Sequence, residues 1–198
     1  GVVRVKGVDP SAAQFQWVRY NPADGSQQQS VVKGATRHQY SPEPADVGWA
    51  LGVTVHRPGT GTPPVSLRTS TPVTSPPAYG EYVARMISRG TWTLNVVIVQ
   101  HCGRVMQERP LHKLEISLAK VKIRTRDDKT RFKEAYNGEM RVCGARGGGD
   151  AAAQGLFLNL KGSMSFMLAC ESKKDRNCAI ALIRKFALLQ SISLASND

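Results

Sequence analysis

The chain has 198 residues, and 27 lysine and arginine residues against 15 acidic ones give it a formal net charge of +12. A hydrophobic content of 41% is ordinary for a folded protein and excludes a disordered tail. The longest apolar run, Val96–Val99, is far shorter than the roughly 18 residues that a membrane-spanning helix needs. We therefore expect no transmembrane segment, and the length suits two small domains or one large one.

The positive charge is concentrated in the second part of the chain. A division near Pro77 leaves 7 basic and 4 acidic residues before it and 20 basic and 11 acidic residues after it. This asymmetry predicts an anionic partner for the second part, which could be a phosphoinositide or membrane surface, a nucleic acid or an acidic protein such as a filament.

All four cysteines lie in the second part, and their spacing matches no zinc-binding pattern. They are Cys102, Cys143, Cys170 and Cys178. We expect no metal and no cofactor. Neither a secretory signal nor an initiating Met precedes Gly1, so we expect a piece of a longer cytosolic protein with reduced, buried thiols.

Residues 1–57 show the pattern of short strands joined by turns. Phe15, Trp17 and Arg19 alternate with their neighbours at a period of two, and the segment Leu51–Val55 does the same. The segment Asn21–Gly25 carries residues typical of a tight hairpin turn. These features predict a small antiparallel β-sandwich with Trp17 in its core.

Residues 58–78 are rich in Pro, Thr, Ser and Gly, a composition typical of a linker. Within this stretch, Val65–Arg68 could form the last strand at the edge of the sheet, because proline is tolerated at sheet edges. We therefore predict two domains, residues 1–78 and residues 79–198.

The second domain is predicted to contain seven strands followed by one helix. The expected strands are residues 91–100, 111–118, 119–126, 130–136, 139–144, 155–160 and 164–170. Ser172 with Asp175 three residues later forms a capping box for the helix. Its predicted apolar stripe contains Ala179, Leu182, Ile183, Phe186 and Leu189, and the opposite side contains Arg176, Arg184 and Gln190.

The segment Lys120–Arg126 alternates four cations with Val, Ile and Thr. On a strand, this period of two places the cations on one face and the β-branched residues on the other. Acidic residues are absent from the cationic face, and Asp127 and Asp128 follow only where the run ends. We call the predicted anion site the basic strip, which comprises Lys120, Lys122, Arg124, Arg126, Arg131 and Lys133. An ordinary solvated strand face is the alternative.

Two other function classes find less support in the sequence. The charge is accompanied by no recognition helix, zinc motif or aromatic-studded sheet face, so we expect no nucleic acid partner. His101 and Cys102 are adjacent, and neighbouring strand residues point in opposite directions, which suits a nucleophile–base pair badly. His112, Asp46 or Glu115 could approach from elsewhere, but we expect no enzyme.

Three stretches carry a resemblance to a known family. The turn Tyr40–Gly48 and the strand after it resemble those of immunoglobulin-like modules, and seven strands followed by one helix resemble a pleckstrin-homology fold. An immunoglobulin-like module followed by a pleckstrin-homology module resembles the C-terminal module of the plant stomatal closure-related actin-binding proteins. The stretches are Gly34–Gly48, Val142–Gly149 and Asn177–Ala187. A related pattern occurs at the end of the plant microtubule-associated, auxin-induced root-culture protein.

The resemblance implies a mainly β fold, with an immunoglobulin-like β-sandwich fused to a pleckstrin-homology-like seven-stranded barrel and a C-terminal α-helix. It also implies a noncatalytic, cytoplasmic, cytoskeleton-associated regulatory module that reaches actin filaments through the full-length protein. Binding of inositol phosphates or anionic lipid headgroups should be weak, because Thr93, Asn95 and Val97 stand where phosphate ligands are expected. An auxiliary contact to actin or microtubules, or to another protein, is the alternative.

Overall fold

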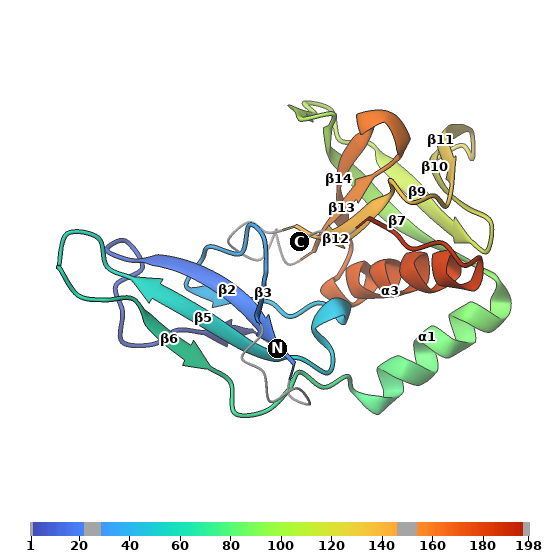
Figure 1. Cartoon of the computed structure of the whole chain (residues 1–198). Coiled ribbons are helices and arrows are strands. Elements are labelled where there is room, and N and C mark those ends of the chain that lie inside the picture. The colour runs from blue at the N-terminus through green and yellow to red at the C-terminus, as the bar shows by residue number, and fades with distance from the viewer. Residues whose placement is uncertain (1, 22–28, 146–153, 196–198) are drawn as a thin grey trace. The chain divides into compact units, whose positions relative to one another are not determined.

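The computed structural model describes residues 2–21, 29–145 and 154–195. The described residues up to Ser75 form one compact unit, and those from Pro76 onward form the other. Both units consist mainly of antiparallel strands, and the two long helices belong to the second (Figure 1). Among the described residues, we find no helix with the length and apolar character needed to cross a membrane.

The first unit contains a four-stranded sheet in the order β3-β2-β5-β6 and a two-stranded sheet formed by β1 and β4. The strands are β1 (Val3–Arg4), β2 (Gln14–Tyr20), β3 (Gln29–Val31), β4 (Gln39–Tyr40), β5 (Ala50–His56) and β6 (Val65–Arg68). The strand β6 pairs with β5 at the edge of the sheet, as the sequence predicts. The predicted turn after Asn21 lies outside the described residues.

Trp17 lies in the core of the first unit, which confirms its predicted role. Its side chain is 1% exposed and stacks on the ring of Tyr40, with 5.5 Å between ring centroids. The indole N–H donates a hydrogen bond to the carbonyl oxygen of Arg37 at 2.7 Å. The hydrogen bond satisfies the polar N–H of the largest side chain in this core, and the stack packs its apolar ring.

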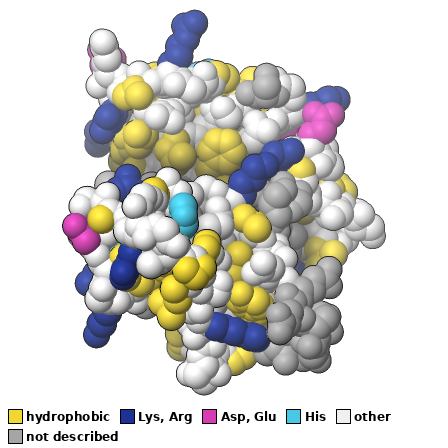
Figure 2. All heavy atoms as spheres, turned by 60° about the vertical axis from the view of Figure 1, so that its left-hand side comes forward, with side chains coloured by type: hydrophobic (Ala, Val, Ile, Leu, Met, Phe, Trp, Pro, Cys, Tyr) yellow, Lys and Arg dark blue, Asp and Glu magenta, His cyan; other side chains and the backbone are white. Residues whose placement is uncertain are grey.

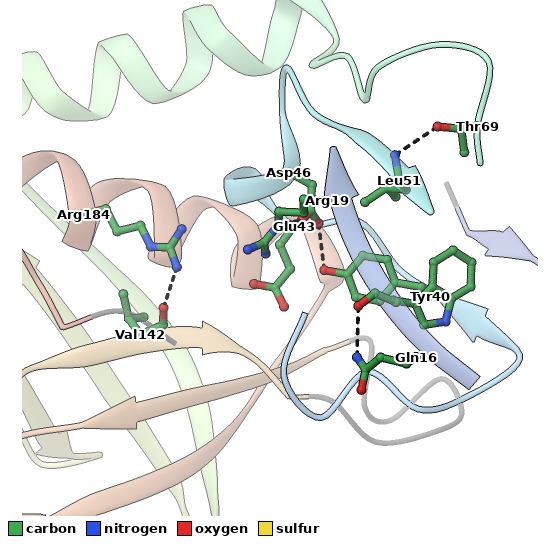
Figure 3. A network of polar contacts seen from close by, with 10 residues as sticks. Gln16, Arg19, Tyr40, Glu43, Asp46, Leu51, Thr69, Val142 and Arg184 are labelled. Carbon is green, nitrogen blue, oxygen red and sulfur yellow. Dashed lines mark hydrogen bonds and ion pairs between the residues drawn. The ribbon is translucent and has the colours of Figure 1, made fainter. Parts of the chain in front are cut away.

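A short 3-10 helix, η1 (Pro44–Asp46), leads into β5 and ends on a buried carboxylate. Oδ2 of Asp46 accepts hydrogen bonds from the hydroxyl of Tyr40 at 2.8 Å and from the backbone N–H of Glu43 at 2.6 Å. Figure 3 shows the Tyr40 side chain pointing toward Asp46. The carboxylate therefore ties this turn to the aromatic core.

The second unit contains one antiparallel sheet in the order β11-β10-β9-β7-β14-β13-β12, with β8 paired to β7. Its strands are β7 (Thr91–His101), β8 (Arg104–Val105), β9 (Leu111–Ser117), β10 (Lys120–Thr125), β11 (Thr130–Ala135), β12 (Arg141–Gly144), β13 (Gly155–Asn159) and β14 (Ser165–Cys170). All seven predicted strands are present, and β8 is an addition.

Helix α3 (Lys173–Leu189) begins where the sequence predicts. The Ser172 hydroxyl oxygen accepts a hydrogen bond from the backbone N–H of Asp175 at 3.1 Å. Four of the five predicted stripe residues are fully buried, but Leu189 is 54% exposed, so the stripe ends at Phe186 and Ala187. The prediction for Arg176 is also wrong, because this side chain is buried and donates to Oδ1 of Asn177.

Helix α1 (Pro77–Arg89) is absent from the sequence prediction, which assigned the start of this stretch to a linker. Proline at the first helical position suits a helix start, and Gly90 ends the helix with a φ of 70°. Met86 is buried, and Tyr82 and Ile87 pack against the core of the second unit. The apolar face of α1 therefore completes that core, and the Pro-rich stretch ends earlier than its composition indicates.

The segment after α3 also belongs to the core of the second unit. Ile192 and Leu194 pack against the buried cluster, and the backbone N–H of Ala195 donates to the carbonyl oxygen of Met140 at 3.0 Å. The side-chain amide of Gln190 donates to the carbonyl oxygen of Leu118. These contacts attach the C-terminal segment to the loops on either side of β10 and β11.

Candidate anion-binding site

The strand β10 has the two faces that its sequence predicts. Val121 and Ile123 are 1% and 0% exposed, whereas Lys120, Lys122 and Arg124 are partly exposed. Because successive side chains on a strand point to opposite faces, the three cations share the outer face of the sheet. The aliphatic side chains on the inner face belong to the hydrophobic core of the unit.

The remaining three residues of the basic strip do not extend this row along one strand. Arg126 is exposed in the turn after β10, and Arg131 and Lys133 are exposed on β11. A shift in register between Ile123 and Arg124 leaves Arg131 without a paired residue on β10. Lys133, in contrast, lies directly opposite Lys122. The strip is therefore a patch over two strands and their turn.

No acidic residue lies on this face of β10 itself, as the sequence predicts, but β9 brings Glu115 beside it on the same face of the sheet. The register of β9 and β10 places Glu115 directly opposite Lys122. Oε1 of Glu115 lies 2.6 Å from Nζ of Lys122, and Oε2 lies 2.9 Å from a terminal guanidinium nitrogen of Arg124. Two cations of the basic strip are thus already neutralised in part by one carboxylate.

A second ion pair lies beside the first. Nζ of Lys113 on β9 is 2.9 Å from Oδ1 of Asp128, in the turn between β10 and β11. The hydrogen bond and the charge of Lys113 lower the pKa of Asp128 below its usual value. Asp128 thus contributes a second carboxylate at this end of the patch.

Four cations of the basic strip have no ion-pair partner among the described residues, and these are Lys120, Arg126, Arg131 and Lys133. Nε of Arg124 is also buried without a hydrogen-bond partner in the described part of the chain. Residues 111–135 contain eight cations and four carboxylates, a net charge of +4. Guanidinium groups can bind phosphate through two hydrogen bonds, and lysines act as point charges, so this surface is suited to anions.

Figure 2 shows the wider charge distribution on one face of the molecule. Lys and Arg side chains stand apart from one another there, and acidic side chains are fewer. In the sequence, residues 111–135 carry +4 of the net charge of +12, and the other residues carry the remaining +8. A general attraction to anions accompanies the local patch.

Four of the five residues considered for catalysis are engaged in other contacts, and Cys102 is the exception. The ring of His101 stacks on Phe166, with 4.7 Å between centroids, and Cys102 is exposed in the turn between β7 and β8. His112 is 2% exposed, and its Nδ1 lies 2.8 Å from the carbonyl oxygen of Pro110. Asp46 and Glu115 are ion-paired. In the described ranges, no three His, Cys, Asp or Glu residues are grouped so that they could hold a metal.

Lys113 and Glu115 are the residues of this surface that the sequence prediction missed. Their alternation with Leu114 and Ile116 places both on the outer face of a strand. The signal was present in the sequence, but only the pairing of β9 with β10 shows that this face adjoins the basic strip.

Comparison with known proteins identifies both units. Residues 91–198 match the family model described as the PH domain of plant-specific actin-binding protein, and residues 2–88 match the Ig domain model of the same family. The solved PH domain of human oxysterol-binding protein-related protein 11 is also similar. It is 10% identical, has a TM-score of 0.39, and the match covers 55% of this chain and 88% of that chain.

Three stomatal closure-related actin-binding proteins of Arabidopsis thaliana are related in sequence. Protein 1 is 36% identical over 190 residues, protein 2 is 29% identical over 192 residues and protein 3 is 30% identical over 190 residues. The matches cover 96–97% of this chain but only 37–38% of each relative. With its immunoglobulin-like unit followed by a pleckstrin-homology unit, the chain belongs to the family of plant-specific actin-binding proteins.

Proposed function

We propose that this chain is a noncatalytic regulatory module that binds inositol phosphates or phosphoinositide headgroups weakly through the basic strip. The protein that contains it acts on actin filaments and is associated with the cytoskeleton in the cytoplasm. The observation that supports this ligand is that four cations on β10, β11 and their turn lack an ion-pair partner among the described residues, and that one of them, Lys133, lies directly opposite Lys122.

The number of available cations sets the expected affinity. Each Lys or Arg near an anionic lipid surface contributes about 1 kcal/mol, so four cations contribute about 4 kcal/mol, which corresponds to roughly millimolar affinity. Lys122 and Arg124 add less than their charges suggest, because Glu115 contacts both. A site of this strength adjusts where a protein resides and does not anchor it alone.

The noncatalytic part of the proposal is supported by the family, since both matched models describe immunoglobulin-like and pleckstrin-homology domains. Incubation of the chain with phosphoinositides, followed by measurement of released phosphate, tests it directly. Turnover above that of a heat-denatured sample would contradict a purely binding role.

Binding is tested by calorimetric titration of the chain with inositol hexakisphosphate. Arg131→Glu combined with Lys133→Glu should weaken binding about ten-fold or more, because two attractive charges become repulsive. Arg85→Glu combined with Arg89→Glu is the matched control, since both arginines are exposed on α1. Equal losses in the two variants, or no binding by the wild type, would contradict the proposal. Sedimentation with phosphatidylcholine vesicles, with and without phosphatidylinositol bisphosphate, distinguishes a lipid headgroup from a free inositol phosphate.

A second candidate function is an auxiliary contact to an acidic filament. It is favoured by the names of the three relatives, which describe actin-binding proteins, and by the charge of +4 over residues 111–135. Co-sedimentation of the chain with actin filaments, and separately with microtubules, at low and high salt tests it. This function would be supported if the wild-type chain pelleted with filaments and the variant with Arg131→Glu and Lys133→Glu did not. It would be excluded if the wild-type chain failed to pellet at low salt.

A further inference from the structure

Glu115 contacts two cations of the basic strip at once, and we infer that it acts as an internal counter-ion that limits anion binding at this surface. The inference rests on the proposed function, because it concerns the same site. It assigns to Glu115 the role of setting affinity, and it predicts which cations of the strip an anion can use.

The strand register fixes this arrangement. Glu115 on β9, Lys122 on β10 and Lys133 on β11 lie in one row across three strands. Lys122 therefore has a carboxylate on one side and a second cation on the other. Two like charges directly opposite each other destabilise a strand pair, and the contact of 2.6 Å between Glu115 and Lys122 offsets that repulsion.

Both oxygens of the carboxylate are occupied. Oε1 contacts Lys122 and Oε2 contacts Arg124, and the three side chains are only 17% to 28% exposed. Partial burial protects these pairs from screening by salt. A phosphate that approaches the strip must compete with Glu115 for both cations, and it is also repelled by the carboxylate.

Glu115 satisfies only part of the hydrogen-bonding capacity of the Arg124 guanidinium group. One terminal nitrogen contacts Glu115, but Nε is buried without a hydrogen-bond partner among the described residues. A guanidinium group binds phosphate best through two parallel N–H groups. Removal of the Glu115 charge would free the terminal nitrogen of Arg124, together with Nζ of Lys122, to contact a phosphate.

The central experiment compares Glu115→Gln with the wild type by calorimetric titration of inositol hexakisphosphate. Glutamine keeps the shape of the side chain but removes the charge, so the affinity should rise about ten-fold. Glu81→Gln is the matched control, because Glu81 is exposed on α1 and the substitution changes the net charge by the same amount. We expect the control to alter affinity less than about two-fold.

A second pair of variants leaves Glu115 intact, so it does not depend on the stability of Glu115→Gln. Lys122→Gln and Lys133→Gln remove the same charge from directly opposite positions. If Glu115 holds Lys122, Lys133→Gln should weaken binding about five-fold and Lys122→Gln less than about two-fold. In the Glu115→Gln background, Lys122→Gln should weaken binding as much as Lys133→Gln does. A double-mutant cycle measures this change.

The outcomes separate this inference from the function on which it rests. Tighter binding by Glu115→Gln alone supports the counter-ion role. If the wild type binds and Glu115→Gln binds with equal or lower affinity, the counter-ion role is overturned and the proposed function stands. The same conclusion would follow if Glu115→Gln and Glu81→Gln gained affinity equally. Equal losses in Lys122→Gln and Lys133→Gln would overturn it as well. No binding by any of these proteins would remove both.

Discussion

Arg19 on β2 and Asp46 at the end of η1 form a buried ion pair, with Nε of Arg19 2.6 Å from Oδ1 of Asp46. Their side chains are 8% and 0% exposed. The other carboxylate oxygen accepts the hydrogen bonds from Tyr40 and from the backbone of Glu43 (Figure 3). One carboxylate thus joins β2, β4 and the turn before β5.

Asp46→Ala should lower the free energy of unfolding of the first unit by about 3–5 kcal/mol, because Arg19 would lose its carboxylate partner inside the protein. Tyr40→Phe, which removes one hydrogen bond and keeps the ring, should cost about 1 kcal/mol. Urea unfolding measures both when it is followed by tryptophan fluorescence in a Trp92→Phe background, where Trp17 and Trp49 of the first unit are the remaining tryptophans. Asp9→Ala is the control, since Asp9 is exposed, and an equal loss there would contradict the structural role of Asp46.

Two glycines should respond to alanine in opposite directions. A Cβ at Gly52 would overlap Cε2 of Tyr20 and lie 3.2 Å from the carbonyl oxygen of Leu67, and Arg68 stacks on the same tyrosine ring. Gly52→Ala should therefore destabilise the first unit by about 1–3 kcal/mol. A Cβ at Gly80, in α1, would meet open space, so Gly80→Ala should stabilise the second unit by about 0.5–1 kcal/mol. Thermal unfolding of the two variants provides the comparison, and a shift of the same sign in both would contradict it.

The segment after α3 should be necessary for the stability of the second unit. Ile192 and Leu194 are partly buried against its core, and Ala195 is bonded to Met140. Replacement of Ile192 and Leu194 by alanine should cost about 2–4 kcal/mol in the free energy of unfolding. The exposed Leu188 is the control, because Leu188→Ala should change stability by less than about 0.5 kcal/mol. Faster hydrogen exchange of the amides in β10 and β12, with unchanged exchange in β2 and β5, would show that the loss is confined to the second unit.

The four cysteines should differ sharply in reactivity. Cys102 is exposed, whereas Cys143, Cys170 and Cys178 are buried. In the native chain, only Cys102 should react quickly with a disulfide reagent, and the other three should react after unfolding. Cys102→Ser should abolish the fast reaction, and rapid modification of a second thiol in that variant would contradict the buried positions.

Alkaline pH should weaken the second unit through the same thiols. Burial raises the pKa of Cys170 to about 12 and that of Cys178 to about 11, from a usual value of 9.0. The unfolded thiols ionise near pH 9, while the folded ones keep their protons, so their contribution to stability is present below pH 9 and is lost as the pH rises toward 11 to 12. Unfolding measured from pH 8 upward should show this decline, and Cys170→Ala should reduce its slope.

The elements that the sequence predicts correctly depend on neighbouring residues alone. The alternation in β10, the capping box of Ser172 and Asp175 and the apolar stripe of α3 are set by backbone geometry over a few residues. Helix α1 was missed because its Pro-rich start has the composition of a linker, and its helical form depends on packing of Met86 against the core. Arg176 was misplaced for a similar reason, since its burial is not encoded in helix periodicity.

For the candidate site, the order of residues along β10 is sufficient to predict which cations share a face, because the pleat of a strand has a fixed period of two. The sequence also determined the charge of the chain and hence the chemical class of the expected partner. Which of those charges lack a carboxylate partner depends on how the strands pair. The pairing of β9 with β10 brings Glu115 to Lys122 and Arg124, and strand register is a long-range property that no local pattern specifies.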